Sequence, residues 1–417
     1  AIETFNGLPL AIGGSGQVVL GGTSANMLLA TLSAPGNAPA SWGQNLTIRG
    51  VGRITGPHIV RGRIWTDVGN GTIDIDGASL LGEGVGRIDA DLGDVFVSDN
   101  AQIAGFTMTA SPAARFRFNG ANQAASSAVN VMNSVIHGSS IIESQSLILT
   151  NSTIGGTMLV PQTTLRFRGS TATLNGTCLV TSTSSFGGGS VQFDEAVSVQ
   201  GTGEFVLQTV PETTVMQTVN NFPVTLGPNI KVRGRGRISG DFNLAGSMVA
   251  DDPFRGVLDI RSSTINGVGS NARIETTTGI LSFLDSDVNN ATIQISPGSE
   301  MRLGLSGSGN QIFNNVAING SVLASSGTSF FNRTSINGGL TVRPGARAIV
   351  AIMPFGLTGD LRINDNFSNS QTSFTFEQSG VLSGSGRIIL RGNPQSITSA
   401  VLGTATNATV SLPDGLT

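Results

Sequence analysis

The sequence is poor in charge and lacks several reactive side chains. Charged residues make up 12% of its 417 residues, tyrosine is absent, Lys231 is the only lysine and Cys178 the only cysteine. A single cysteine excludes an intramolecular disulfide. The net charge is -3 and the arginines are scattered without a basic stripe, so nucleic acid is not an expected partner.

Long apolar runs are also missing. The longest candidate, Ala348–Leu357, is interrupted by Pro354, whereas a membrane-spanning helix needs about 20 apolar residues. We therefore expect no membrane insertion within this segment. The first ten residues lack the basic region of a signal peptide and a starting Met. The chain is expected to be processed, or to be a piece of a longer protein.

What the chain has instead is 57 glycines, together with many Ser, Thr, Asn, Val and Ile residues. β-Branched side chains favour pleated strands, and Gly and Asn tolerate the positive φ angles of tight turns. This composition predicts an all-β protein with many short strands and little helix.

A long repeat runs through the sequence. The stretch "IRGVGRITG" (Ile48–Gly56) returns as "VRGRGRISG" (Val232–Gly240), and the segment from Asn133 resembles the segment from Asn314. A third element occurs three times, as "GGSGQVVL", "QGTGEFVL" and "SGSGRIIL". We predict one continuous solenoid over residues 1–417, with repeats of about 184 residues at approximately 1–187, 188–370 and, in part, 371–417.

A shorter sequence repeat lies within the repeat of about 184 residues. Glycines recur about 18 to 20 residues apart, from Gly138 to Gly156 to Gly176 and again from Gly320 to Gly338. This spacing predicts a parallel β-helix (β-solenoid) with about 20 residues and three short strands per coil, and we expect a right-handed coil. A single coil cannot bury its inner face alone, so coils must stack.

Two further expectations follow from this fold. The 20 phenylalanines need no hydrogen-bond partner and should stack inside the coils, for example Phe205, Phe283 and Phe331. Glycine runs such as "GVGRITG" resemble a phosphate-binding loop, but that loop must open a helix and a strand-like segment follows here. We interpret these glycines as turn residues.

Candidates for chemistry are few. His58 and His137 are the only histidines, and the second repeat has none, so both are expected at turns or on the surface. Cys178 lies in an apolar strand and should be a buried structural thiol. The sequence therefore predicts no catalytic, metal-binding or cofactor-binding residue and no cofactor.

The acidic segment from Asp67 to Asp99 admits three interpretations. The second repeat keeps acids at some of its positions: Asp67, Asp74, Asp89 and Asp99 correspond to Asp251, Asp259, Glu275 and Asp285. It loses them at others: Asp76, Glu83, Asp91 and Asp94 correspond to Arg261, Val268, Thr277 and Ile280. Neighbouring arginines favour ion pairs between coils. A calcium site and a catalytic acid–base pair stay open as alternatives.

The pattern Asn-x-Ser/Thr occurs nine times, at Asn45, Asn70, Asn151, Asn175, Asn290, Asn319, Asn332, Asn366 and Asn407. In a chain rich in these residues the pattern arises by chance. We interpret the asparagines as ladders stacked between coils.

The strand–"PGA"–strand corners and the "N-x-x-I-x-G" beat resemble the repetitive β-helical surface proteins of bacteria, which include large adhesins, autotransporter passengers and filamentous-haemagglutinin-like stalks. The resemblance implies an extracellular, non-enzymatic protein that acts by extension and surface contact. Its expected partners are copies of itself, further covalent repeats end to end, and surface glycans.

The function expected from this resemblance is that of a structural or adhesive fibre or stalk segment. The alternatives are a β-helical polysaccharide lyase or hydrolase and a non-catalytic carbohydrate-binding stalk. Against the enzyme stand the lack of tyrosine and the presence of only Trp42 and Trp65 for sugar stacking. The sequence stops at Thr417, where the two earlier repeats continue into "IRG" and "VRG", so we expect end-to-end stacking or covalent continuation.

Overall fold

The structure is a computed structural model that describes residues 10–23, 30–34, 36, 38–98, 100–119, 128–144, 146–182, 187–208, 213–304, 309–364, 372–391, 400–406 and 408–411. All regular elements in these residues are β-strands, which confirms the all-β prediction. Over the same residues there is no helix long and apolar enough to cross a membrane. The chain divides into two compact units, residues 1–206 and 207–417.

The strands of each unit are short for the most part and follow one another in chain order. Those of unit 1 are β1 (Leu10–Ile12), β2 (Ser15–Gly21), β3 (Thr31–Ser33), β4 (Ala40–Trp42), β5 (Asn45–Val60), β6 (Arg63–Thr66), β7 (Thr72–Ala90), β8 (Asp94–Ser98), β9 (Gln102–Ala110), β10 (Phe116–Asn119), β11 (Val129–Met132), β12 (Val135–His137), β13 (Ser139–Ser144), β14 (Ser146–Thr150), β15 (Thr153–Ile154), β16 (Thr157–Pro161), β17 (Thr164–Arg168), β18 (Thr171–Leu174), β19 (Thr177–Thr181), β20 (Ser190–Phe193), β21 (Ser198–Gln200) and β22 (Glu204–Gln208), whose last residues begin unit 2.

The strands of unit 2 are β23 (Val215–Thr218), β24 (Val224–Leu226), β25 (Lys231–Gly234), β26 (Gly236–Leu244), β27 (Ser247–Ala250), β28 (Val257–Gly267), β29 (Arg273–Thr276), β30 (Ile280–Asn289), β31 (Thr292–Ile295), β32 (Glu300–Leu303), β33 (Asn310–Asn314), β34 (Ala317–Asn319), β35 (Val322–Ala324), β36 (Gly327–Asn332), β37 (Ser335–Asn337), β38 (Leu340–Val342), β39 (Ala346–Ile352), β40 (Phe355–Leu357), β41 (Leu361–Asn364), β42 (Thr372–Phe376), β43 (Gly380–Ser383), β44 (Ile388–Arg391), β45 (Ala400–Thr404) and β46 (Val410–Ser411).

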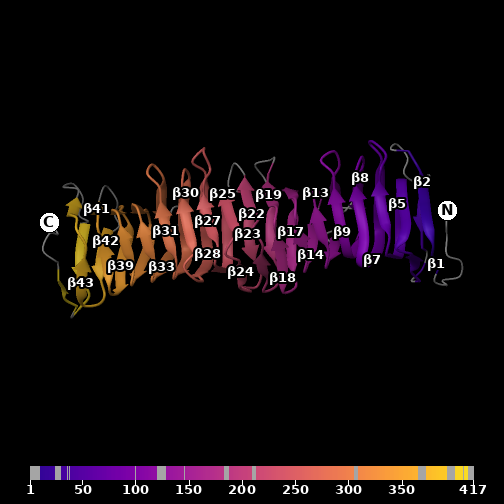
Figure 1. Cartoon of the computed structure of the whole chain (residues 1–417). Coiled ribbons are helices and arrows are strands. Elements are labelled where there is room, and N and C mark those ends of the chain that lie inside the picture. The colour runs from indigo at the N-terminus through magenta and orange to yellow at the C-terminus, as the bar shows by residue number, and fades with distance from the viewer. Residues whose placement is uncertain are drawn as a thin grey trace. The chain divides into compact units, whose positions relative to one another are not determined.

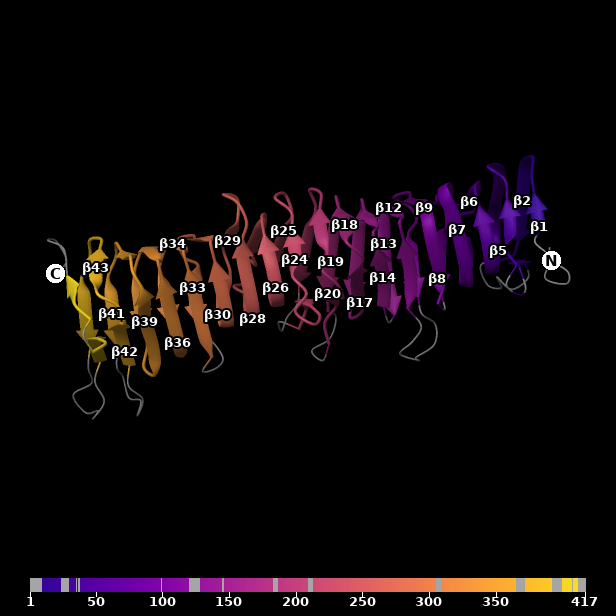
Figure 2. The ribbon, with the colours of Figure 1, turned by 90° about the horizontal axis from the view of Figure 1, so that it is seen from below.

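Within each unit the strands pair in parallel with strands one coil further along the chain, as the side-by-side arrows of Figure 1 and Figure 2 show. The length of a coil varies: Thr47 pairs with Arg63, whereas Leu10 pairs with the more distant Ala40. Three strands make one coil, since β12, β13 and β14 pair with β15, β16 and β17. The predicted β-solenoid is confirmed. Its handedness, and its continuity from residue 1 to 417, stay predictions.

Phenylalanine rings fill the interior of both units. In unit 1, Phe193 stacks on Phe167 with ring centroids 5.2 Å apart, and Phe205 meets both rings edge-on. In unit 2 the rings of Phe283 and Phe313 lie 5.5 Å apart, and Phe331 stacks on Phe313 at 5.6 Å. The side chains of Phe205, Phe283 and Phe331 are fully buried, as predicted. The apolar core is therefore continuous from coil to coil within each unit.

Columns of glycine at one corner of the coils account for the short beat of the sequence. A Cβ atom on Gly156 would lie 1.9 Å from the carbonyl oxygen of Gly138, and one on Gly176 would lie 1.9 Å from that of Gly156. Unit 2 repeats the column, since a Cβ on Gly338 would lie 2.3 Å from the carbonyl oxygen of Gly320. Only glycine lets the backbones of successive coils approach this closely.

The same requirement explains the repeated nonapeptide. Gly50 and Gly234 both have a φ of +104°, and a Cβ on either would lie within 2.3 Å of a carbonyl oxygen of the preceding coil. Gly50 lies inside the long strand β5, and the residues on both sides of it belong to the same strand, so no helix begins after the glycine. No helix follows these glycines, so they do not form the phosphate-binding loop. The expectation that they are turn residues is corrected, because Gly50, Gly52 and Gly56 lie within strand β5.

Truncation of a stacked ring tests the core. Phe283→Ala should lower the free energy of unfolding by about 3 to 5 kcal/mol, because it leaves a cavity among fully buried rings. The matched control is Phe254→Ala, whose side chain is 82% exposed and should change stability by about 0.5 kcal/mol or less. Urea unfolding measures both. Equal midpoints for the two variants would contradict this description of the core.

Candidate functional site

Arginines of neighbouring coils hold most of the acidic segment in ion pairs. Arg53 Nε lies 3.1 Å from Oδ2 of Asp74, and its Nη1 lies 3.0 Å from Oδ2 of Asp76. The other pairs in this region are Arg49–Asp67, Arg61–Glu83, Arg63–Asp89, Arg87–Asp89, Arg115–Asp94 and Arg117–Asp94. Asp91 lies in a turn, where its carbonyl oxygen accepts a hydrogen bond from Ser111. Asp99 lies outside the described residues.

Three of the four acids that the second repeat retains also keep an arginine, including Glu275, which lies 3.9 Å from Arg273. Arg233 lies 3.7 Å from Asp251, in the positions of Arg49 and Asp67. Arg237 lies 4.0 Å from Asp259, in the positions of Arg53 and Asp74. The predicted ion pairs between coils are confirmed. Over the described residues, no group of three or more His, Cys, Asp or Glu side chains is arranged to hold a metal ion.

One ion pair of the second repeat is replaced at both of its positions by apolar residues in the first repeat. Arg235 and Asp252 lie 3.3 Å apart, and Asp252 also accepts a 2.7 Å hydrogen bond from the backbone N–H of Gly256. Val51 and Val68 occupy these two positions in the first repeat. An apolar pair thus replaces a charged pair at an equivalent place in the architecture. This exchange indicates that the charges serve coil stacking.

His58 corrects the expectation that both histidines lie at turns or on the surface. Its side chain is buried, and Nδ1 accepts a 3.1 Å hydrogen bond from the indole N–H of Trp42. Nε2 therefore carries the proton and donates to the carbonyl oxygen of Thr55 at 2.9 Å. Burial lowers the pKa of His58 below its ordinary value of 6.5, against a smaller opposing effect of the Thr55 hydrogen bond. This histidine is a neutral core residue.

The other two candidates lie where the sequence predicts them. His137 is exposed at the end of β12, beside Gly155 of the next coil. Cys178 is fully buried in β19 opposite Met158, and burial raises the pKa of its thiol. A buried thiol with a raised pKa is a poor nucleophile.

Side-chain amides form ladders between coils in unit 2. Asn332 donates to Asn314 at 2.6 Å, and Asn314 donates to Asn289 at 2.6 Å. Two more asparagines of the nine Asn-x-Ser/Thr patterns, Asn290 and Asn319, accept hydrogen bonds from the next coil. These contacts confirm the ladder interpretation for those positions. Asn366 and Asn407 lie outside the described residues.

Two carboxylates of unit 2 interact electrostatically. Asp241 and Asp287 share one column on β26 and β30, with Thr264 of β28 in register between them. Burial, and then the charge of Asp241, raises the pKa of Asp287. Two coil steps therefore separate the two carboxylates in this column.

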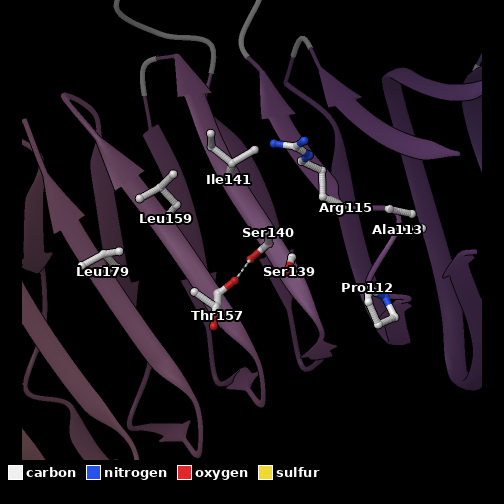
Figure 3. A pocket seen from close by; sticks show the side chains of 10 residues that line it. Pro112, Ala113, Arg115, Ser139, Ser140, Ile141, Thr157, Leu159 and Leu179 are labelled. Carbon is white, nitrogen blue, oxygen red and sulfur yellow. Dashed lines mark hydrogen bonds between the residues drawn. The ribbon is translucent and has the colours of Figure 1, made fainter. Parts of the chain in front are cut away.

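A shallow groove on the outside of unit 1 was not predicted from the sequence. It has a volume of about 310 Å³ and lies beside the turn Pro112–Arg115. Ile141, Leu159 and Leu179 follow one another across its floor, on β13, β16 and β19 (Figure 3). Hydroxyl-bearing Ser139, Ser140 and Thr157 lie along its side, and Ser140 donates a 3.4 Å hydrogen bond to the carbonyl oxygen of Thr157. The signal in the sequence is an apolar residue at the outward position of one strand in each of three successive coils.

Comparison of the chain with protein-family models, curated proteins and solved structures finds no match.

The buried histidine predicts an acid-sensitive stability. Because the folded state holds the pKa of His58 below 6.5, the unfolded state takes up a proton first as pH falls. The free energy of unfolding should therefore decrease below about pH 6.5. The double variant Trp42→Leu/His58→Phe, which imports Leu226 and Phe242 of the second repeat, should lose this contribution. Urea midpoints at pH 7.5 and pH 5 compare the two proteins. An identical decrease in both would contradict the assignment.

Proposed function

We propose that this chain is a structural or adhesive segment of an extracellular fibre or stalk, which works by extension and by end-to-end stacking with copies of itself or with further covalent repeats. The observation that carries the proposal is the use of polar side chains between coils. Arg53 bridges Asp74 and Asp76, and Asn332 extends the ladder of Asn314 and Asn289. These ion pairs and amide hydrogen bonds join one coil to the next and so stabilise the stack of coils along its axis.

The recurrence of the same contacts in both repeats supports the proposal. Ser152 donates to the carbonyl oxygens of Val131 and Thr150, at 3.2 and 3.0 Å. Thr334, its equivalent in the second repeat, donates to Phe313 and Asn332 at 3.0 and 3.1 Å. A set of contacts that works twice in one chain can join any number of further repeats, which is the property that a fibre needs.

The extracellular location and the contact with surface glycans rest on the resemblance to bacterial surface proteins. A charge-poor surface rich in Ser, Thr and Asn suits such a setting. The carboxylates of the acidic segment pair with arginines, which argues against a polysaccharide lyase or hydrolase that uses them as its acid and base.

The proposal predicts assembly without hydrolysis. Electron microscopy of the purified chain at rising concentration should show thin filaments, and separate particles at every concentration would contradict the fibre. Incubation with a panel of polysaccharides should release neither reducing ends nor unsaturated products. Release of either product from one polysaccharide, abolished by boiling the protein, would favour the enzyme instead.

A further inference from the structure

A polar hollow of about 250 Å³ lies on the outside of unit 2, where three successive coils turn into β31, β34 and β37. Each coil contributes one short run to its lining: Asn290–Thr292, Asn315–Ala317, and Arg333 with Ser335. Thr292, Ala317 and Ser335 stand in register, one on each strand, and form an outward column. Among the described residues of the lining, Arg333 carries the only charge and none is a carboxylate.

The first repeat builds the same column with larger side chains. Four positions are equivalent by register, and Thr107, Val135, Thr153 and Thr173 of the first repeat correspond to Thr292, Ala317, Ser335 and Gly356 of the second. Three of the four positions are therefore smaller in the second repeat. The smaller side chains open the hollow, and the fold itself does not require them.

Two of the three turns beside this column gain a polar or charged group in the second repeat. The turn residues Asn290, Asn315 and Arg333 have positive φ angles of 52°, 54° and 49°. Their first-repeat equivalents, with φ angles of 73°, 46° and 46°, are Gly105, Asn133 and Asn151. The second repeat thus adds an amide at Asn290, whose Oδ1 accepts a 2.9 Å hydrogen bond from Asn315, and a guanidinium at Arg333.

Arg333 does not replace Asn151 structurally. Oδ1 of Asn151 accepts hydrogen bonds from the backbone N–H groups of Ser170 and Thr171, at 3.1 and 3.3 Å. A guanidinium has no acceptor atom, and Pro354, which has no N–H, takes the position of Thr171 in unit 2. The exposed Arg333 forms no ion pair with a carboxylate of the described residues. Its left-handed backbone conformation disfavours arginine, and no described contact offsets that cost.

The chemistry of the hollow matches a sugar that carries a carboxylate. The hydroxyl groups of Thr292 and Ser335 can both donate and accept hydrogen bonds, as sugar hydroxyls do. A guanidinium binds a carboxylate through two parallel N–H donors, and no carboxylate among the described lining residues competes for Arg333. The next outward column on the same strands is made of amides, from Gln294, Asn319 and Asn337. Its first-repeat equivalent consists of Thr109, His137 and Gly155.

We propose that the hollow binds a carboxylate-bearing sugar of a surface polysaccharide. The carboxylate pairs with Arg333, and the sugar hydroxyls bond to Asn290, Thr292 and Ser335. Ala317 leaves the space that the ring occupies, and the amide column beside it receives the neighbouring sugar. This inference deepens the proposed contact with surface glycans and rests on it only in expecting a polysaccharide as the partner. It does not depend on end-to-end stacking.

Two variants test the site with residues that the first repeat already uses at these positions. Arg333→Asn takes the residue of Asn151, and Ala317→Val takes that of Val135. The probes are short oligomers of galacturonate, mannuronate and glucuronate, titrated calorimetrically at low salt up to about 10 mM. At least one should bind the wild-type chain. Each variant should bind that oligomer about tenfold more weakly, because Arg333→Asn removes a charge-assisted hydrogen bond and Ala317→Val fills the hollow.

The control variant is Arg343→Asn. It removes the same charge from another exposed turn of unit 2, outside the hollow, and should bind as the wild type does. The methyl ester of the bound oligomer is the control ligand, and it should bind wild type and Arg333→Asn with equal, weaker affinity because it has no carboxylate to pair. Acetate alone should not compete, since it lacks the hydroxyls. If Ala317→Val does not fold, Ser335→Thr, which takes the residue of Thr153, replaces it.

Four results would overturn the inference: no binding of any of the oligomers by the wild type, equal weakening in Arg333→Asn and Arg343→Asn, an ester that binds as tightly as the acid, or acetate that binds as tightly as the oligomer. Filaments of a wild-type chain that binds no oligomer would overturn this site and leave the fibre intact. Binding that depends on Arg333 in a chain that forms no filaments would support the site and count against the end-to-end fibre.

Discussion

The close approach of one coil to the next is the constraint on which the rest of this structure depends. Gly138, Gly156 and Gly176 lie so near the carbonyl oxygens of neighbouring coils that a single added carbon would collide with them. At that separation the backbones form parallel ladders, and each interior side chain contacts its equivalent in the next coil. The phenylalanine stacks, the asparagine ladders and the arginine–carboxylate pairs all follow from this spacing.

A stacked architecture also decides which substitutions the chain accepts. Some residues that face the next coil change together with their partners, as Val51 and Val68 do where the second repeat has Arg235 and Asp252. Residues at turn tips and on outer faces are free of this coupling. Differences between the repeats at such positions, as at Arg333 and at Ala317, are therefore the places where function separate from architecture is to be sought.

Much of the fold could be predicted from the sequence because its strongest signals are local. The spacing of Gly138 and Gly156 gives the length of their own coil, and phenylalanines on inward strand positions such as Phe205 and Phe283 are buried as predicted. Phe254, at the tip of a turn, is exposed and departs from that prediction. The burial of His58 could not be predicted because the long strand β5 bends at Gly50 and Gly56, which disturbs the alternation of inward and outward residues. The groove could not be predicted because its floor joins three coils, and the length of a coil varies along the chain.

The free energy of unfolding of Gly156→Ala tests the stacking constraint most directly. The added methyl group would meet the Gly138 carbonyl oxygen at 1.9 Å, so the variant should lose about 3 kcal/mol. Gly69→Ala is the matched control, because a Cβ at that position meets nothing within 4 Å, and it should change stability by about 0.5 kcal/mol or less. A Gly156→Ala protein as stable as the Gly69→Ala protein would contradict the account.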